Sequence, residues 1–126
     1  MSHGSVFIKT QGAAPSLVQA HLDTGASVTS IDIKLAHHMR LTPVGTSQMM
    51  TAGGMVRTPS FIIDLQFPAS TLSSRTNLSI SSCDMGFDVN SPLSDIQNFG
   101  ILIGRDVMAL WNIVWNGPTS TVIIND

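Results

Sequence analysis

The segment Asp23-Thr24-Gly25-Ala26-Ser27 contains the residue types in this chain that are best suited to chemistry. It presents one carboxylate among small side chains. Gly25 has no Cβ to keep a substrate or a second backbone away, and the hydroxyl groups of Thr24 and Ser27 can hydrogen-bond backbone groups of a loop. A carboxylate presented in this way suits acid–base work, although Asp-Thr-Gly alone is also a common turn.

Predicted strands lie on both sides of this segment. Residues 18–22 alternate between apolar and polar side chains, which is the period of a half-buried strand. Residues 28–31 are rich in β-branched residues and serine and are predicted to continue as a strand. Asp23 is therefore expected in a tight loop at the end of a strand.

A second motif lies toward the C-terminal end of the chain. Residues 99–103 are wholly apolar and predict a strand that is buried on both faces. Gly104 follows this strand, and residues 105–110, which open with Arg105 and Asp106, predict a short helix.

The two motifs together resemble the active-site loop and the downstream apolar-apolar-Gly-Arg-Asp segment of the retropepsin-like aspartic proteases, over residues 17–124. The resemblance implies an all-β, closed, barrel-like domain with one or two short helices and a glycine-rich flap hairpin. It also implies an active site that two copies of the chain form together.

The resemblance assigns a role to each matching residue. Asp23 would be the catalytic carboxylate, and Thr24 would hydrogen-bond across the dimer axis, while Gly25 would offer its carbonyl to the substrate. The active-site loop would comprise Thr24, Gly25 and Ala26. Substrate would contact Ser27, Val28, Ser30 and, from the flap, Ala52, Gly53, Gly54 and Met55. The loop would be supported by Ile103, Gly104, Arg105 and Asp106.

Arg105 marks a departure from the family pattern. Viral members commonly have an acid two positions after the glycine of the loop, where it can pair with this arginine, but this chain has Ser27 there. Arg105 must then find another partner, and Asp106 or a backbone carbonyl are the alternatives.

Aspartic-protease chemistry needs two carboxylates that share one proton, because like charges so close cannot both ionise. This chain contains one Asp-Thr-Gly. Asp84-Met85-Gly86 is a poor second copy, since Met85 has no hydroxyl and no alternating strand precedes it. A homodimer that cleaves peptides at apolar residues, without a cofactor, is the leading hypothesis.

Two other hypotheses stay open. One is a dimeric peptide-binding or scaffolding module that keeps the fold without cleaving, which the missing acid at position 27 motivates. The other is a domain of a longer precursor that stays inactive until it assembles or cleaves itself.

The composition is consistent with a single domain over residues 1–126, with residues 1–5 as a cloning remnant or a disordered end. Of the 126 residues, 43% are hydrophobic and 11% are charged, which suggests that a partner covers apolar surface. The net charge of -2 gives no reason to expect nucleic acid as a partner. No apolar run is long enough for a membrane span and no signal peptide is recognisable, so a cytoplasmic location is the default expectation.

Neither a disulfide nor a metal site is expected. Cys83 is the single cysteine and reads as a small apolar residue rather than a nucleophile. His37 and His38 are neighbours on a predicted helix, where their side chains point about 100° apart, and no acid is placed to complete a site.

Further strands are predicted at residues 6–10, 44–50, 61–67, 76–82, 113–115 and 121–124, and a short helix at 33–39 with Asp32 as its N-cap. By resemblance, residues 6–10 and 122–124 are the candidates for a sheet between the two subunits.

Overall fold

The computed structural model describes residues 3–9, 14–68, 72–116, 118 and 121–125. The strands are β1 (His3–Lys9), β2 (Ser16–Leu22), β3 (Ser30–Asp32), β4 (Gly45–Thr51), β5 (Gly54–Gln66), β6 (Arg75–Cys83), β7 (Phe99–Ile103), β8 (Asn112–Asn116) and β9 (Thr121–Asn125). The helices are α1 (Ile33–His38) and α2 (Arg105–Met108). The described part of the chain contains no helix with the length and apolar character needed to cross a membrane.

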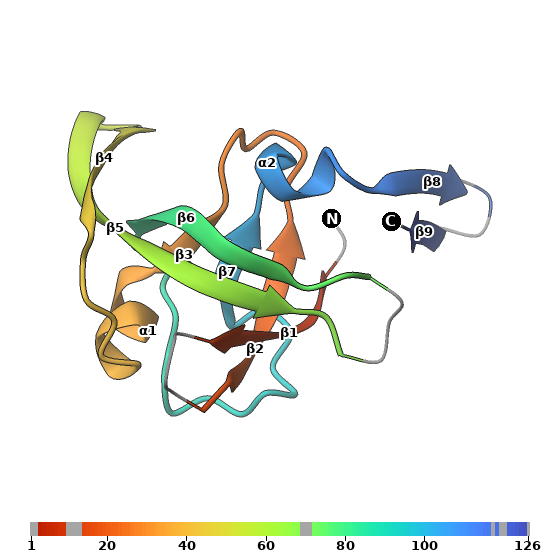
Figure 1. The fold of residues 1–126 in the computed structure, drawn as a ribbon, viewed down its shortest axis with the longest axis horizontal. Helices are drawn as coiled ribbons and strands as arrows, with labels where there is room; N and C mark the ends of the chain where they lie inside the picture. Colours follow the sequence, from red (N-terminus) through yellow and green to blue (C-terminus); the bar gives the residue numbers. More distant parts are fainter. Residues whose placement is uncertain (1–2, 10–13, 69–71, 117, 119–120, 126) are drawn as a thin grey trace.

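Six strands form a closed barrel (Figure 1). They follow the order β1-β2-β7-β3-β6-β5, and β5 pairs with β1 to complete the ring. The pairs β2–β7 and β3–β6 are parallel, while the other barrel pairs are antiparallel. This confirms the expected all-β, closed, single-domain architecture with two short helices.

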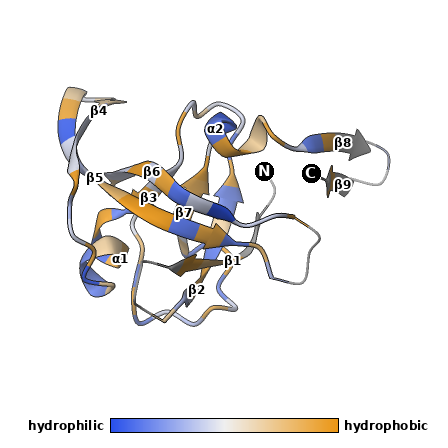
Figure 2. Ribbon diagram, viewed as in Figure 1, coloured by the Kyte–Doolittle hydropathy of each residue, from blue (hydrophilic) through white to orange (hydrophobic). Residues whose placement is uncertain are grey.

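The barrel encloses an apolar core. Along β5, Phe61, Ile63 and Leu65 are almost completely buried while Ile62 is exposed, which is the alternation predicted for residues 61–67. Figure 2 shows the same mixture of hydrophobic and hydrophilic residues along the barrel strands. Trp111, which follows α2, joins the core by an edge-to-face contact with Phe67 at 5.2 Å between ring centroids.

The β4–β5 hairpin extends away from the barrel (Figure 1). Strand β5 begins at Gly54, not at the predicted residue 61, because residues 54–60 pair with β4 before the strand enters the barrel. Thr51 pairs with Gly54, so Ala52 and Gly53 form the turn. Of the two adjacent glycines only Gly54 has a positive φ, +109°, a conformation that side chains rarely allow.

Strand β1 bears on two expectations about the N-terminus. It begins at His3, and the backbone of residues 3–5 pairs with β2, so these residues belong to the folded sheet. Within the described residues, β1 pairs with β2 on one edge and with β5 on the other. Phe7 and Ile8 pair with both strands, so their backbone edges are occupied within one chain. Thr10 lies outside the described residues, and the place of residues 6–10 in a sheet between subunits stays a prediction.

The C-terminal segment forms the predicted hairpin. Strands β8 and β9 pair with each other in a separate two-stranded sheet beside the barrel (Figure 1). Residues 122–124 belong to β9, and their place in a sheet between subunits stays a prediction.

Candidate active site

Asp23 follows directly after β2, in a loop that backbone hydrogen bonds hold in place. Its N–H donates to the carbonyl oxygen of Ile103 at 3.0 Å, which ties the loop to the end of β7. The N–H of Gly25 donates to Asp23 Oδ1 at 2.8 Å, and the N–H of Ala26 donates to the Asp23 carbonyl at 3.2 Å. The carboxylate is therefore fixed to its own loop and is half-buried.

This local turn does not by itself distinguish Asp23. Asp84, Asp88 and Asp95 each accept a hydrogen bond on Oδ1 from the backbone N–H two residues later, at 2.9, 2.9 and 3.1 Å. All three of these side chains are exposed. Asp23 differs from these three residues in two ways. Its loop is hydrogen-bonded to the end of β7, and its side chain lines a cleft.

The support comes from a buried hydrogen-bond network centred on Thr29. The Thr29 N–H donates to Asp106 Oδ2 at 3.0 Å, and its hydroxyl donates to Asp106 Oδ1 at 2.7 Å. The same hydroxyl accepts from the N–H of Gly104 at 3.1 Å. One fully buried threonine thus joins the Asp23 loop to the end of β7 and to α2.

Gly104 lets these parts come close together. A Cβ on Gly104 would lie 2.6 Å from both the carbonyl carbon and oxygen of Val28, a distance that real Cβ atoms do not reach. The next residue, Arg105, donates its N–H to the carbonyl of Ala26 at 2.9 Å. Residues 103–106 therefore contact the loop at several points.

Arg105 does not pair with Asp106. Both carboxylate oxygens of Asp106 accept from Thr29, and Oδ1 also accepts from the N–H of Val107 at 2.9 Å. The Arg105 side chain is exposed, and no side-chain partner for it is found within the described residues. The alternative that paired Arg105 with Asp106 is therefore wrong, because Asp106 is held by Thr29.

Asp23 lies in the wall of a cleft of about 410 Å³. The described residues that line it are Asp23, Gly25, Ala26, Ser27, Val28, Ser30, Gln48, Met49, Met50, Cys83, Met85 and Leu102. Six of these were predicted as site residues. Thr24 and the predicted flap residues Ala52, Gly53, Gly54 and Met55 are not among the described lining residues.

The predicted substrate contacts of Ala52, Gly53, Gly54 and Met55 stay a prediction, and the structure adds a neighbouring part of the same hairpin to the cleft. Residues 48–50 of β4 line the cleft, whereas Ala52 and Gly53 form the turn beyond it. Leu102 was also missed as a lining residue. Its neighbours Ile101 and Ile103 are buried in the core, so alternation along β7 puts Leu102 on the other face. Because residues 99–103 are wholly apolar, the sequence alone does not indicate which of them face the cleft.

Cys83 lines the same cleft without the features of a nucleophile. Burial raises the pKa of its thiol, and the negative charges of Asp32 and Asp84 raise it further. The thiolate is disfavoured, so the side chain acts as a small apolar part of the cleft wall.

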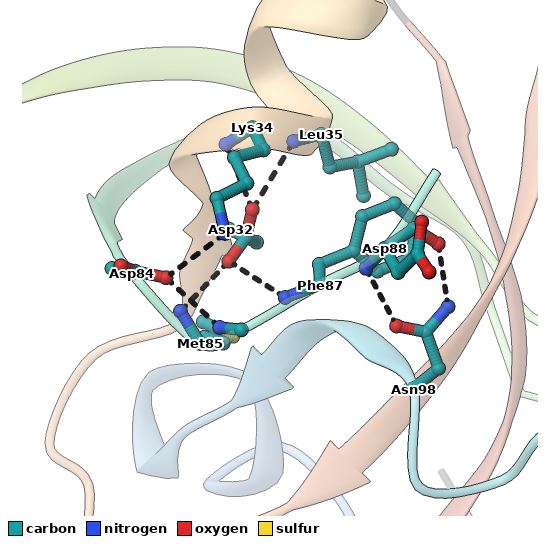
Figure 3. A network of polar contacts seen from close by, with 9 residues as sticks. Asp32, Lys34, Leu35, Asp84, Met85, Phe87, Asp88 and Asn98 are labelled. Carbon is teal, nitrogen blue, oxygen red and sulfur yellow. Dashed lines mark hydrogen bonds and ion pairs between the residues drawn. The ribbon is translucent and has the colours of Figure 1, made fainter. Parts of the chain in front are cut away.

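Asp32 is fully buried, and its contacts are structural (Figure 3). Its Oδ1 accepts from the N–H groups of Lys34 and Leu35 at 2.7 and 3.2 Å, which caps α1. Its Oδ2 accepts from the N–H groups of Met85 and Phe87 at 2.7 and 3.4 Å. The segment that was considered as a second catalytic copy is therefore the partner of a helix cap.

His37 and His38 are exposed on α1, at a larger open cleft of about 840 Å³ that Asp23 does not line. Within the described residues, no group of three or more histidine, cysteine or acidic side chains is placed to hold a metal ion.

Comparison with known proteins agrees with this geometry. A protein-family model described as aspartyl protease matches residues 11–107, and no curated protein matches the chain. The matched region covers most of the 126 residues and includes both the Asp23 loop and residues 103–106. The chain therefore belongs to the aspartyl protease family, in its retropepsin-like form.

Proposed function

We propose that this protein is a homodimeric aspartic endopeptidase, in which Asp23 from each of two copies activates one water molecule. One observation carries the proposal: the fixed carboxylate of Asp23 and residues 48–50 of the flap strand line the same cleft of about 410 Å³. Membership of the aspartyl protease family supports it.

The second carboxylate has to come from a second copy of the chain. Asp23 is the only acid among the described residues that line the cleft. Asp32 is fully buried and accepts four backbone hydrogen bonds, and Asp84 is exposed outside the cleft. A two-fold axis beside the Asp23 loop would bring the two equivalent carboxylates together.

Two such carboxylates divide the chemistry between them. They share one proton, since both cannot ionise at close range. The protonated carboxyl donates a hydrogen bond to the scissile carbonyl, while the ionised one takes a proton from the attacking water. The Gly25 N–H, which donates to Asp23 Oδ1 at 2.8 Å, limits rotation of each carboxylate.

The cleft suits peptides with apolar side chains near the scissile bond. The apolar residues that line it are Ala26, Val28, Met49, Met50, Met85 and Leu102. Methionine side chains are flexible and adapt to differently shaped partners, so several aliphatic or aromatic side chains should fit. Thr24 is exposed instead of lining the cleft, which leaves its hydroxyl available to the second subunit.

The test compares two aspartate variants on a mixed peptide library across a range of pH. Asp23→Asn keeps a side-chain oxygen for the Gly25 N–H but removes the acid, so kcat/KM should fall by about 10²–10⁴-fold. Asp84→Asn is the matched control, because Asp84 has the same turn outside the cleft. Its activity should stay within about twofold of wild type.

Sedimentation at several concentrations completes the experiment. Cleavage should follow the dimer concentration and disappear on dilution below the dimer dissociation constant. If the wild-type dimer binds peptides but cleaves none at any pH, the protease proposal fails and a peptide-binding module takes its place. Full activity in Asp23→Asn would contradict the assigned chemistry.

A further inference from the structure

The segment of residues 84–87 follows the end of β6 and contributes to the walls of two separate clefts. Met85 is half-buried and lines the Asp23 cleft. Phe87, two residues later, lines the open cleft beside α1 and is not among the described residues of the Asp23 cleft. The position of this segment therefore determines where part of the wall of the Asp23 cleft lies.

The backbone of this segment has left the sheet, and a side chain takes the place of the neighbouring strand. Strand β6 ends at Cys83, which pairs with Asp32 at the end of β3. Beyond that pair, Asp32 Oδ2 accepts from the N–H groups of Met85 and Phe87 at 2.7 and 3.4 Å (Figure 3). Gly86 lies between these two residues with a φ of +75°, a left-handed conformation that lets both N–H groups reach one oxygen.

The two oxygens of Asp32 have different partners. Oδ1 accepts from the N–H groups of Lys34 and Leu35, which caps α1, and a serine at an N-cap makes the same kind of contact with its single side-chain oxygen. Oδ2 has only the 84–87 segment as its partner. Helix capping therefore accounts for one oxygen of this fully buried carboxylate, and the second oxygen holds the cleft wall.

We propose, on the basis of the protease function inferred above, that Asp32 is a positioning residue for peptide binding: its Oδ2 holds Met85 in the wall of the Asp23 cleft. Asp32 does not line that cleft, so it acts on the peptide through Met85. The thioether of Met85 has no proton to give or take. Displacing Met85 should therefore weaken peptide binding and leave the chemical step unchanged, which raises KM without lowering kcat.

The first test compares the wild-type protein with Asp32→Ser. Serine can cap α1 but has no second oxygen for the Met85 N–H. The KM of the peptide that the wild type cleaves fastest should rise about five- to tenfold, while kcat changes by less than about twofold. Asp95→Ser is the matched control, because Asp95 accepts a backbone N–H between β6 and β7 and does not line the cleft. Its KM should stay within about twofold of wild type.

A double-mutant cycle separates the positioning of Met85 from a general loss of structure. Met85→Ala should raise KM by about as much as Asp32→Ser does. If Asp32 acts through Met85, adding Asp32→Ser to Met85→Ala should change KM by less than about twofold. Increases in KM that multiply would overturn the proposal, because they would mean that Asp32 acts on the fold and not on Met85. An unchanged KM in Asp32→Ser would also overturn it.

The position of Met85 can also be measured by NMR without catalysis, in protein with isotope-labelled methionine methyl groups. The Met85 resonance is identified by its absence from Met85→Ala. Asp32→Ser should move it toward the resonance of a solvent-exposed methionine, while that of Met108, which is buried in the core, stays in place. An unchanged Met85 resonance would overturn the proposal. If the wild type cleaves no peptide, the protease function fails, and this measurement still decides whether Asp32 positions Met85.

Gly86→Ala displaces the same segment and leaves Asp32 intact. Gly86 is exposed, and an added Cβ would meet no atom within 4 Å, but its φ of +75° disfavours any side chain. The Met85 resonance and KM should therefore change in the same direction as in Asp32→Ser. If Asp32→Ser does not fold, an unchanged Met85 resonance and KM in Gly86→Ala would overturn the proposal.

Discussion

Thr29 connects three parts of the active-site region through one hydroxyl group. This hydroxyl donates to Asp106 at 2.7 Å, accepts from Gly104 at 3.1 Å and is fully buried. The hydrogen bond from the Gly104 N–H is buried, so this group would have no other partner nearby if the hydroxyl were lost. Thr29 is therefore expected to determine how firmly the Asp23 loop is held.

Replacing Thr29 by valine tests this role, because valine keeps the shape and removes the hydroxyl. The Gly104 N–H loses its acceptor, while Asp106 Oδ1 keeps only the hydrogen bond from Val107, so the free energy of unfolding should fall by about 1–3 kcal/mol. Urea denaturation at a fixed protein concentration measures the loss. Thr29→Ser keeps the hydroxyl and should lose clearly less; equal losses in the two variants would show that packing, not hydrogen bonding, gives Thr29 its importance.

Cys83 permits a prediction about pH. Burial and the charges of Asp32 and Asp84 raise its thiol pKa, so less thiolate is present at a given pH than in an unfolded chain. The pH midpoint for alkylation by iodoacetamide should therefore be higher in the folded protein than in urea. Asp84→Asn removes one negative charge and should lower that midpoint, whereas Asp95→Asn should not.

The pH midpoint of alkylation is measured instead of the alkylation rate, because burial of the thiol also slows its reaction with iodoacetamide. A midpoint in the folded protein at or below that of the unfolded chain would contradict the raised pKa.

Single residues differed in how well the sequence revealed them. Asp23 was predictable because its type, its small neighbours and the strand before it all lie within one short segment. Thr29 was not, because its importance depends on Asp106, which is 77 positions away. Gln48 and Met85 were missed for a similar reason, since a cleft wall is assembled from strands whose pairing is not local.

At the scale of elements, β5 belongs to two structures at once. Its residues 54–60 pair with β4 in the hairpin, and residues 61–65 pair with β6 in the barrel. Strand β5 therefore runs without a break from the hairpin into the barrel, and the shape of the hairpin depends on the turn at its tip.

The turn can be tested with two glycine variants. Gly54 has a φ of +109°, so Gly54→Ala strains the hairpin. We expect kcat/KM to fall by about tenfold with little change in thermal stability, because the hairpin lies outside the core. Gly53→Ala is the control, as Gly53 has no positive φ, and an equal loss in both variants would contradict this explanation.

The sequence predicted where helices and strands lie along the chain better than which strands pair with each other. The apolar run of residues 99–103 has the same bounds as β7, and Asp32 caps α1 as expected. The first half of β5 was missed because residues 55–60 lack clear alternation and include Pro59. For β1, periodicity predicted the strand but did not indicate that β2 and β5 pair with its two edges.

At the scale of the whole molecule, the proposed active site needs Asp23 from each of two copies of the chain. Mixing wild-type protein with an equal amount of Asp23→Asn should leave about one quarter of the dimers with two aspartates. Total cleavage should then fall to about half of that given by the same amount of wild type alone. Activity that does not fall on addition of the variant would show that one chain suffices, and Asp84→Asn should cause no fall.

The order of the strands in the barrel also has a consequence for how the chain folds. Within the described residues, closure rests on three pairs between β1 and β5, from Phe7–Gln66 to Lys9–Asp64. During synthesis β1 leaves the ribosome first, and β5 follows only after β2, β3 and β4. Closure between such distant segments makes folding slow for a chain of this size. Until β5 arrives, the outer edge of β1 is the place where nascent chains would pair with one another by mistake.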